Sequence, residues 1–270
     1  MASPILVTGG TGTLGRHVVP LLREAGRDVR VLSRRGREPA DGVEYVTGDL
    51  LKNEGIEEAI GAAGIVVHLA GGAKGDDEAA RNLVRAAARA GVQHLVFISV
   101  IGSDRVPLSW LKTQSDAEQA VIDSGVPWTI QRAAQFHDLV LKAVQSMAKF
   151  PVVPNPGGLR FQPVDARDVA ARIAGLVLGE PAGRVPDLAG PKVYGMDELV
   201  RGYLGARGRR RPMMPVRIPG KAGRAYRAGD NLALDGADHG TRTWEDFLDE
   251  RLGQAGSTRA PAHSLSPGSG

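Results

Sequence analysis

The segment Thr8-Gly9-Gly10-Thr11-Gly12-Thr13-Leu14-Gly15 decides the fold of this chain. It follows the apolar run Ile5-Leu6-Val7, and its end overlaps the start of residues 14–22, whose apolar side chains repeat with a helical period. The spacing G-x-G-x-x-G therefore lies in a turn between a predicted strand and a predicted helix, which is the context in which it indicates dinucleotide binding. Glycines let the backbone approach a pyrophosphate, and the start of the helix offers unpaired N–H groups and a partial positive charge. The segment predicts a dinucleotide-binding loop with contacts from Gly9, Thr11, Gly12, Thr13 and Leu14; a purely structural glycine turn is the alternative.

Short β-rich runs alternate with amphipathic helical runs over the first two thirds of the sequence. This alternation is typical of a parallel sheet that helices cover on both faces. We therefore expect an α/β fold with a Rossmann-type doubly wound parallel sheet. The expected strands are 5–8, 29–33, 43–47, 65–69, 94–99 and 128–131.

The pattern changes after Phe150, where a Pro/Gly stretch begins. We expect an NAD(P)-binding Rossmann core over residues 1–150, and a small C-terminal substrate-side lobe with the remaining core elements over residues 151–252. Residues 253–270 are rich in Gly, Ser, Pro and Ala, which predicts a disordered tail. Asp165 and Asp168 suit the N-cap and N3 positions of a helix, although a catalytic role for these carboxylates is the alternative.

Composition excludes several classes of protein. The 270 residues include no cysteine, and the six histidines show no metal-ligand spacing, so we expect no disulfide and no metal site. No apolar run approaches the roughly 18 residues that a membrane helix needs, and the first strand begins too early to follow a signal peptide, so we expect a cytoplasmic protein without membrane contact. The net charge of +4 raises the question of a nucleic-acid partner, but the aromatic content of only 4% leaves few side chains on which bases could stack, so we do not expect one. The basic segment 207–217 is either a solvated loop or a surface for a protein or another anionic partner.

The end of the second expected strand decides which dinucleotide is preferred. The residues there are Ser33, Arg34 and Arg35, and no acidic residue occurs between Asp28 and Glu38. An acid would accept bonds from a ribose 2′-hydroxyl, whereas two guanidinium groups can hold a 2′-phosphate. The sequence favours NADP(H) over NAD(H); two solvent-facing arginines without a ligand are the alternative.

Taken together, six segments resemble the NmrA-like group of atypical short-chain dehydrogenases/reductases. They are Thr8 to Gly15, Gly48-Asp49-Leu50, His68-Leu69-Ala70-Gly71, Phe97-Ile98-Ser99, Ser124 to Arg132 and Gln162-Pro163-Val164-Asp165. The resemblance implies that Asp49 and Leu50 border the adenine, and that Leu69, Ala70 and Gly71 pass along the cofactor. From the residue alone, Asp49 could equally cap the next helix.

The same resemblance implies a Tyr-x-x-x-Lys dyad, and counting back from Ser124 without a gap places it at Trp110 and Gln114. Neither residue can replace its counterpart, because an indole does not titrate and a neutral amide does not lower the pKa of a neighbour. We expect Gln114 to bind the nicotinamide ribose and Trp110 to stack on the substrate or the nicotinamide ring. Ser99 remains as a hydrogen-bond donor to a substrate carbonyl, or as a hydroxyl that satisfies local backbone.

Gln135, Phe136 and His137 follow the last expected strand, beyond the carboxyl edge where ligands bind in such sheets. We expect these three residues to line the substrate pocket with Trp110. His137 titrates in the useful range and is a candidate proton donor, with a structural histidine as the alternative.

These observations favour an NADP(H)-binding oxidoreductase that acts on a small activated acceptor such as a quinone or an enone. Electron-poor acceptors need less help from a general acid, which otherwise contributes roughly 10² to 10⁴-fold in rate. The missing dyad keeps two alternatives open. One is a catalytically silent NAD(P)H sensor or regulatory binding protein, and the other is a non-redox rearrangement that uses the dinucleotide fold.

Overall fold

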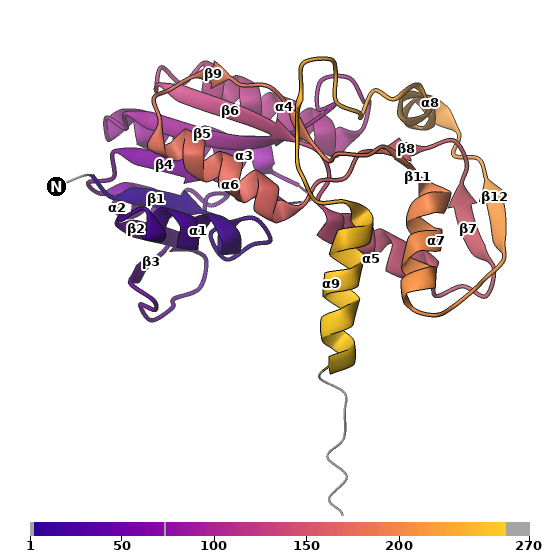
Figure 1. Cartoon of the computed structure of the whole chain (residues 1–270). Coiled ribbons are helices and arrows are strands. Elements are labelled where there is room, and N and C mark those ends of the chain that lie inside the picture. Colours follow the sequence, from indigo (N-terminus) through magenta and orange to yellow (C-terminus); the bar gives the residue numbers. More distant parts are fainter. Residues whose placement is uncertain (1–2, 73, 258–270) are drawn as a thin grey trace, which may run out of the picture.

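The computed structural model describes residues 3–72 and 74–257. Within these residues the chain folds around a nine-stranded sheet with helices on both faces (Figure 1). The strand order is β13-β10-β6-β5-β4-β1-β2-β3, β9 lies beside β6, and each neighbouring pair is parallel. The strand order reverses between β1 and β4, which is the point where doubly wound sheets bind ligands. The predicted Rossmann-type fold is confirmed.

The six predicted strands form with small differences at their ends. The fourth ends at His68, one residue early, while the fifth and sixth continue to Val100 and Ala133. The strands of the large sheet are β1 (Ile5–Thr8), β2 (Val29–Ser33), β3 (Val43–Thr47), β4 (Ile65–His68), β5 (His94–Val100), β6 (Trp128–Ala133), β9 (Gly183–Arg184), β10 (Leu188–Ala189) and β13 (Asp238–His239).

Two apolar cores lie on opposite faces of this sheet. One face packs on α1 (Gly15–Glu24) and α6 (Ala166–Leu178), and the other packs on α2 (Ile56–Ile60), α3 (Asp76–Arg89) and α4 (Ser109–Ile122). The β-branched residues of the central strands contribute to both cores, because successive side chains of a strand point to opposite faces. A parallel sheet that is buried on both faces explains the continuous apolar runs in the sequence.

The C-terminal lobe has its own apolar cluster, centred on the fully buried Trp244 and Tyr194. Its helices are α5 (His137–Met147), α7 (Met196–Ala206), α8 (Gly220–Ala228) and α9 (Trp244–Ser257), and its strands are β7 (Val153–Pro156), β8 (Arg160–Phe161), β11 (Tyr194–Gly195) and β12 (Met213–Val216). Strand β12 pairs with β7, and β11 pairs with β8. Helix α5, which precedes the predicted boundary at residue 150, also packs into this cluster.

The final helix continues further than predicted. Residues 253–257, which we expected to begin a disordered tail, form the last part of α9. The remainder of that predicted tail, residues 258–270, lies outside the described residues. None of the described helices combines the length and the apolar character needed to cross a bilayer.

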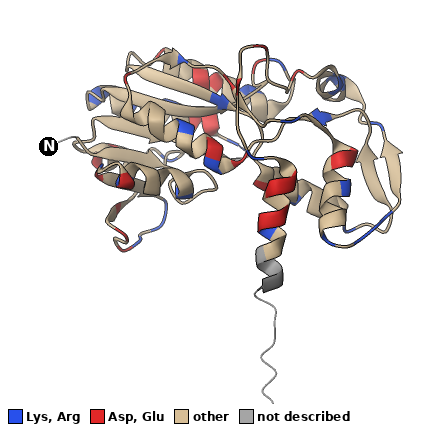
Figure 2. Cartoon of the chain, in the orientation of Figure 1, with Lys and Arg blue, Asp and Glu red and all other residues tan. Residues whose placement is uncertain are grey.

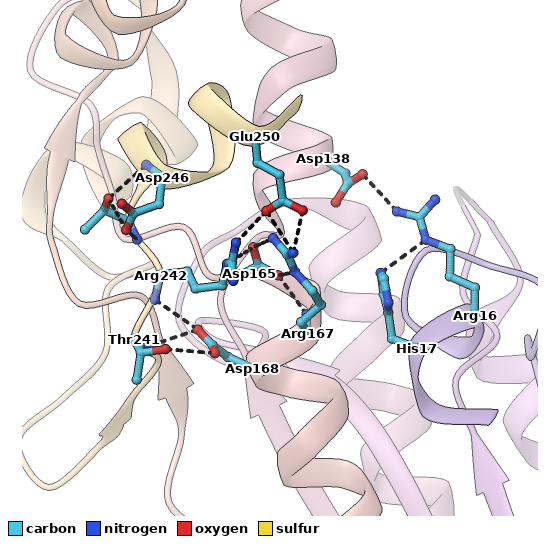
Figure 3. A network of polar contacts seen from close by, with 11 residues as sticks. Arg16, His17, Asp138, Asp165, Arg167, Asp168, Thr241, Arg242, Asp246 and Glu250 are labelled. Carbon is cyan, nitrogen blue, oxygen red and sulfur yellow. Dashed lines mark hydrogen bonds and ion pairs between the residues drawn. The ribbon is translucent and has the colours of Figure 1, made fainter. Parts of the chain in front are cut away.

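Ion pairs join α9 to the start of α6 (Figure 3). Arg167 contacts Asp165 at 2.8 Å and Glu250 at 2.9 Å, and Asp165 caps α6 by accepting a bond from the Arg167 amide at 2.8 Å. Asp168 instead accepts bonds from the amides of Thr241 and Arg242, at 2.9 and 3.2 Å. Asp165 therefore acts as the predicted N-cap, whereas Asp168 fixes the chain that enters α9.

The two central strands are also joined by buried side chains. Thr8 Oγ1 and His68 Nδ1 lie 2.6 Å apart in a hydrogen bond at the ends of β1 and β4. Burial lowers the pKa of His68 from 6.5 to about 4. Between about pH 4 and pH 6.5, this ring is therefore neutral in the folded protein, whereas it would be protonated in the unfolded chain.

This difference predicts acid sensitivity. Because the unfolded state binds the additional proton, the free energy of unfolding falls as the pH is lowered from about 6.5 to about 4, by about 3 kcal/mol from His68. Chemical denaturation across this range should show a smaller pH dependence in His68→Asn than in the wild type. The exposed His239 offers the matched control, His239→Asn, which should retain the wild-type slope. Equal slopes in all three proteins would contradict the assignment.

Candidate cofactor and substrate site

The glycine loop joins β1 to α1 at the point where the strand order reverses. Gly9 has φ +71°, and a Cβ at this position would lie 2.6 Å from the backbone nitrogen of Ala70. A Cβ at Gly15 would lie 2.3 Å from the carbonyl oxygen of Gly9. Because neither approach leaves room for a side chain, these glycines allow the loop, the first turn of α1 and the segment after β4 to pack backbone against backbone.

The loop leaves hydrogen-bond donors available at the start of α1. The helix has no side-chain cap at Leu14 and no acidic residue in its first turn. The Gly12 amide donates to Gly9 at 2.9 Å, but across residues 3–72 and 74–257 no group accepts from the amides of Thr13 or Leu14. Free amides at a helix N-terminus favour an anion. This glycine cradle therefore fits the pyrophosphate of a dinucleotide, with the exposed Thr11 and Gly12 at its rim.

The end of β2 carries the residues expected to choose between the two dinucleotides. Ser33 is half-buried, and Arg34 and Arg35 are exposed. The Arg35 amide lies 3.4 Å from Ser33 Oγ, and neither guanidinium forms an ion pair with any described residue. Both arginines are therefore available to an anionic ligand.

The residues predicted to border the adenine lie after β3. Asp49 Oδ1 accepts bonds from the amides of Leu51 and Lys52, at 2.9 and 3.3 Å. The carbonyl of Leu50 accepts a bond from the buried Asn82 at 2.7 Å. The capping function weighed for Asp49 is thus present, although it caps the turn at residues 51–53 rather than a helix.

The segment after β4 forms the opposite wall of the cradle. The Leu69 amide donates to Thr8 at 3.1 Å, which continues the β1–β4 pairing, and Ala70 lies against Gly9. Gly71 is exposed. Leu69, Ala70 and Gly71 thus follow the loop as a dinucleotide wall would require.

Gln114 links this wall to α4. It is buried and donates through Nε2 to Asp76 at the start of α3, and Asp76 also accepts a bond from the Gly72 amide at 2.8 Å. Burial raises the pKa of Asp76. Since Nε2 is occupied, the amide oxygen of Gln114 is the atom left to accept a bond from a ribose hydroxyl.

Ser99 belongs to a buried polar network rather than to an open pocket. Its hydroxyl donates to Glu118, which also binds Arg132 through two hydrogen bonds of 2.8 Å and Arg184 through one of 2.9 Å. The side chains of Glu118 and Arg132 are only 3% and 6% exposed. The Ser99 hydroxyl therefore already donates its proton to Glu118. This geometry supports neither the predicted bond to a substrate carbonyl nor the alternative bond to local backbone.

Trp110 packs against the same small apolar cluster as a residue that sequence reasoning missed, Tyr226. Trp110 and Tyr226 of α8 both pack against the small cluster of Val106, Leu111 and Ala225. The Tyr226 ring also lies 5.6 Å from that of Phe161. Burial raises the pKa of Tyr226, so the phenol is protonated at neutral pH. No local pattern marks this tyrosine, because α8 lies far along the chain from α4.

The three residues after β6 do not face a common space. Phe136 packs against the core under α1 and α6, whereas His137 is fully buried with its ring 5.8 Å from Trp244 and 5.2 Å from Phe247. Burial lowers the pKa of His137. His137 thus matches the alternative given for it, a structural histidine, because its neutral ring is enclosed in the core of the lobe. This geometry does not support His137 as a proton donor. The amide nitrogen and oxygen of Gln135, like both ring nitrogens of His137, are buried without a hydrogen-bond partner among the described residues.

No metal site accompanies this arrangement in the described ranges, where no three His, Cys, Asp or Glu side chains gather closely enough to hold an ion. The site consists of a glycine cradle, two exposed arginines and a wall that leads toward Gln114 and Trp110. These features define a Rossmann-fold protein built to bind a dinucleotide.

Comparisons with known proteins agree with this geometry. Residues 9–177 match a protein family described as NAD(P)H-binding. The chain belongs to this NAD(P)H-binding family, and its resemblance to atypical short-chain dehydrogenases/reductases is confirmed.

Two relatives are reductases. A (4-alkanoyl-5-oxo-2,5-dihydrofuran-3-yl)methyl phosphate reductase from Streptomyces griseus subsp. griseus is 36% identical over 196 residues, which cover 70% of this chain and 68% of the relative. An NAD(P)H azoreductase from Xenophilus azovorans is 30% identical over 215 residues, covering 76% of this chain and 74% of the relative. In fold, the chain is similar to an NADPH-dependent quinone oxidoreductase from Escherichia coli solved with NADPH, with a TM-score of 0.75, 18% identity, and coverage of 92% of this chain and 99% of that one.

The close packing of the glycine cradle predicts that a single added methyl group at Gly15 would disturb it. Gly15→Ala should weaken NADPH binding by at least about tenfold and lower the free energy of unfolding by about 1 to 3 kcal/mol, because the Cβ would overlap Gly9. Titration of NADPH by fluorescence and thermal unfolding measure the two effects. The matched control is Gly175→Ala in α6, where a Cβ would meet no atom within 4 Å. The control should bind NADPH normally and gain about 0.5 to 1 kcal/mol; normal binding by Gly15→Ala would argue against the cradle.

Proposed function

We propose that the protein is an NADPH-dependent reductase of a small activated acceptor such as a quinone or an enone. The observation that carries the proposal is the glycine cradle, whose Thr13 and Leu14 amides are free and whose glycines leave no room for side chains. The two reductase relatives support a redox reaction. The cytoplasmic location remains a prediction from the sequence.

The preference for NADP(H) over NAD(H) is part of this proposal. Arg34 and Arg35 are exposed at the end of β2 and have no ion-pair partner among the described residues. Two forked guanidinium groups would hold a 2′-phosphate through charge-assisted hydrogen bonds. Asp49, the nearest acid in the expected adenine wall, is occupied by the amides of Leu51 and Lys52.

The chemistry requires a hydride and a proton. Bound NADPH would supply the hydride, and the acceptor would gain one proton to complete the two-electron reduction. On the protein side, Thr13 and Leu14 would hold the pyrophosphate, and Gln114 would accept a bond from the ribose. The proton would come from Tyr226, because the indole of Trp110 does not titrate and the hydroxyl proton of Ser99 is held by Glu118. Electron-poor acceptors suit a site without the lysine of the dyad.

A regulatory binding protein is the second candidate, and the same residues favour it. Trp110 and Gln114 stand at the dyad positions, and Gln114 and Ser99 are both bound to carboxylates. Such a protein would bind NADPH and NADP⁺ with different affinity and would show no turnover. Non-redox rearrangement remains a third candidate, which would give product without net oxidation of NADPH.

Removing the two arginines should change cofactor preference. In Arg34→Ser/Arg35→Ser, the Kd for NADPH should rise about 10²-fold, because two charge-assisted contacts are lost, while the Kd for NADH should change by no more than about twofold. Calorimetric titration of both cofactors measures the ratio. If the wild type binds NADH as tightly as NADPH, the proposed preference is wrong.

Turnover should depend on the phenol of α8. NADPH oxidation with a panel of quinones and enones should proceed in the wild type, and Tyr226→Phe should lower kcat by about 10²-fold without changing the Kd for NADPH. The control Tyr203→Phe removes the hydroxyl of another half-buried tyrosine and should leave kcat unchanged. The absence of wild-type turnover with every acceptor would favour the regulatory candidate, and a fully active Tyr226→Phe would remove the tyrosine from the reaction.

A further inference from the structure

A second basic site lies at the far end of the C-terminal lobe. Figure 1 places α7 and β12 at the opposite end of the molecule from β1, β2 and β3. Between the last turn of α7 and the start of β12 is a hollow of about 520 Å³. Its lining includes four arginines and two apolar residues, namely Arg201, Arg209, Arg210, Arg211, Leu204 and Met213. We call it the arginine hollow, and Figure 2 shows the basic loop that borders it.

The positive charge of the arginine hollow is largely uncompensated. Arg201 contacts Asp197 at 2.7 Å, and Arg211 donates to the carbonyl of Phe150 at 2.5 Å. Among the ion pairs of the described residues, none includes Arg209 or Arg210. Four guanidinium groups thus share one carboxylate. Like charges at this density repel one another, and an anion in the hollow would relieve that repulsion.

Capping of α7 does not account for these arginines. Cations often gather at a helix C-terminus to satisfy its last carbonyls and its partial negative charge. Here backbone amides already satisfy three of the last four carbonyls: Tyr203, Leu204 and Gly205 accept bonds from residues 207–209 at 2.8 to 3.2 Å. Gly208 has φ +61°, and this reversal sends Arg209 to Arg211 back beside the helix. The guanidinium groups of Arg209 and Arg210 therefore remain available to a ligand.

We propose that the arginine hollow binds a phosphate-bearing small molecule. A planar guanidinium matches two phosphate oxygens, and several guanidinium groups around one hollow can surround a phosphate or diphosphate. Leu204 is buried and Met213 is half-buried, so they give the hollow an apolar wall for the remainder of such a ligand. The volume suits a small organic phosphate. This site is separate from the glycine cradle and does not depend on the proposed reductase activity.

The test uses the full chain saturated with NADPH, so that the glycine cradle is occupied. Calorimetric titration with inorganic pyrophosphate and with phenyl phosphate should show binding to the wild type. The double variant Arg209→Ser/Arg210→Ser should weaken that binding by at least about tenfold and leave the Kd for NADPH unchanged. The matched control is Lys142→Ser/Arg251→Ser, which removes the same charge from exposed positions outside the hollow and should bind both probes like the wild type.

Three results would overturn the proposal. The first is no heat with either probe, and the second is equal weakening in the variant and its control, which would indicate net charge alone. The third comes from added arms with phosphatidylglycerol vesicles and a single-stranded oligonucleotide. Binding to either of these by the wild type, without binding of the small phosphates, would assign the arginines to a membrane or to nucleic acid instead.

Discussion

The close contact between the glycine loop and the segment after β4 is the constraint on which the rest of the site depends. A Cβ at Gly9 would fall within 2.7 Å of three backbone atoms of Leu69 and Ala70, and one at Gly15 would overlap Gly9 and Gly10. These contacts bring three backbone segments together at the reversal of the strand order. Because α1 starts directly at Gly15, this packing stands next to the amides of Thr13 and Leu14, which donate to no acceptor among the described residues. The sequence needs no charged residue there to attract an anion.

A buried ion pair between Glu118 and Arg132 stabilises the other side of the site. Glu118 and Arg132 lie almost entirely out of water, and such a pair persists only when hydrogen bonds satisfy most of its polar atoms. Ser99, Ser103, Asp104 and Arg184 provide these bonds. The network ties the ends of β5 and β6 to α4, so the helix that carries Trp110 and Gln114 is held rigidly against the sheet. It also explains why a serine at the end of β5 is unavailable for chemistry.

Local patterns predicted the fold well and the site only in part. The glycine loop, the central strands and the N-cap Asp165 are encoded within a few residues, and the sequence was sufficient to predict them. The bonds of Gln114 to Asp76 and of Ser99 to Glu118 join distant segments, and no periodicity marks them. One signal was present in retrospect: Gln114 and Glu118 are four residues apart, so α4 presents both polar side chains on its inner face.

The crossing of α6 back to the core has a consequence for biosynthesis. Val169, Ile173 and Val177 of this helix cover Val7, Val67 and other core residues of strands formed much earlier in the chain. While the protein is being translated, that apolar surface stays open until α6 has left the ribosome. The Rossmann half of the molecule therefore cannot complete its core until α5, β7 and β8, which precede α6 in the chain, have been synthesised, and the nascent chain must be kept from aggregating over that interval.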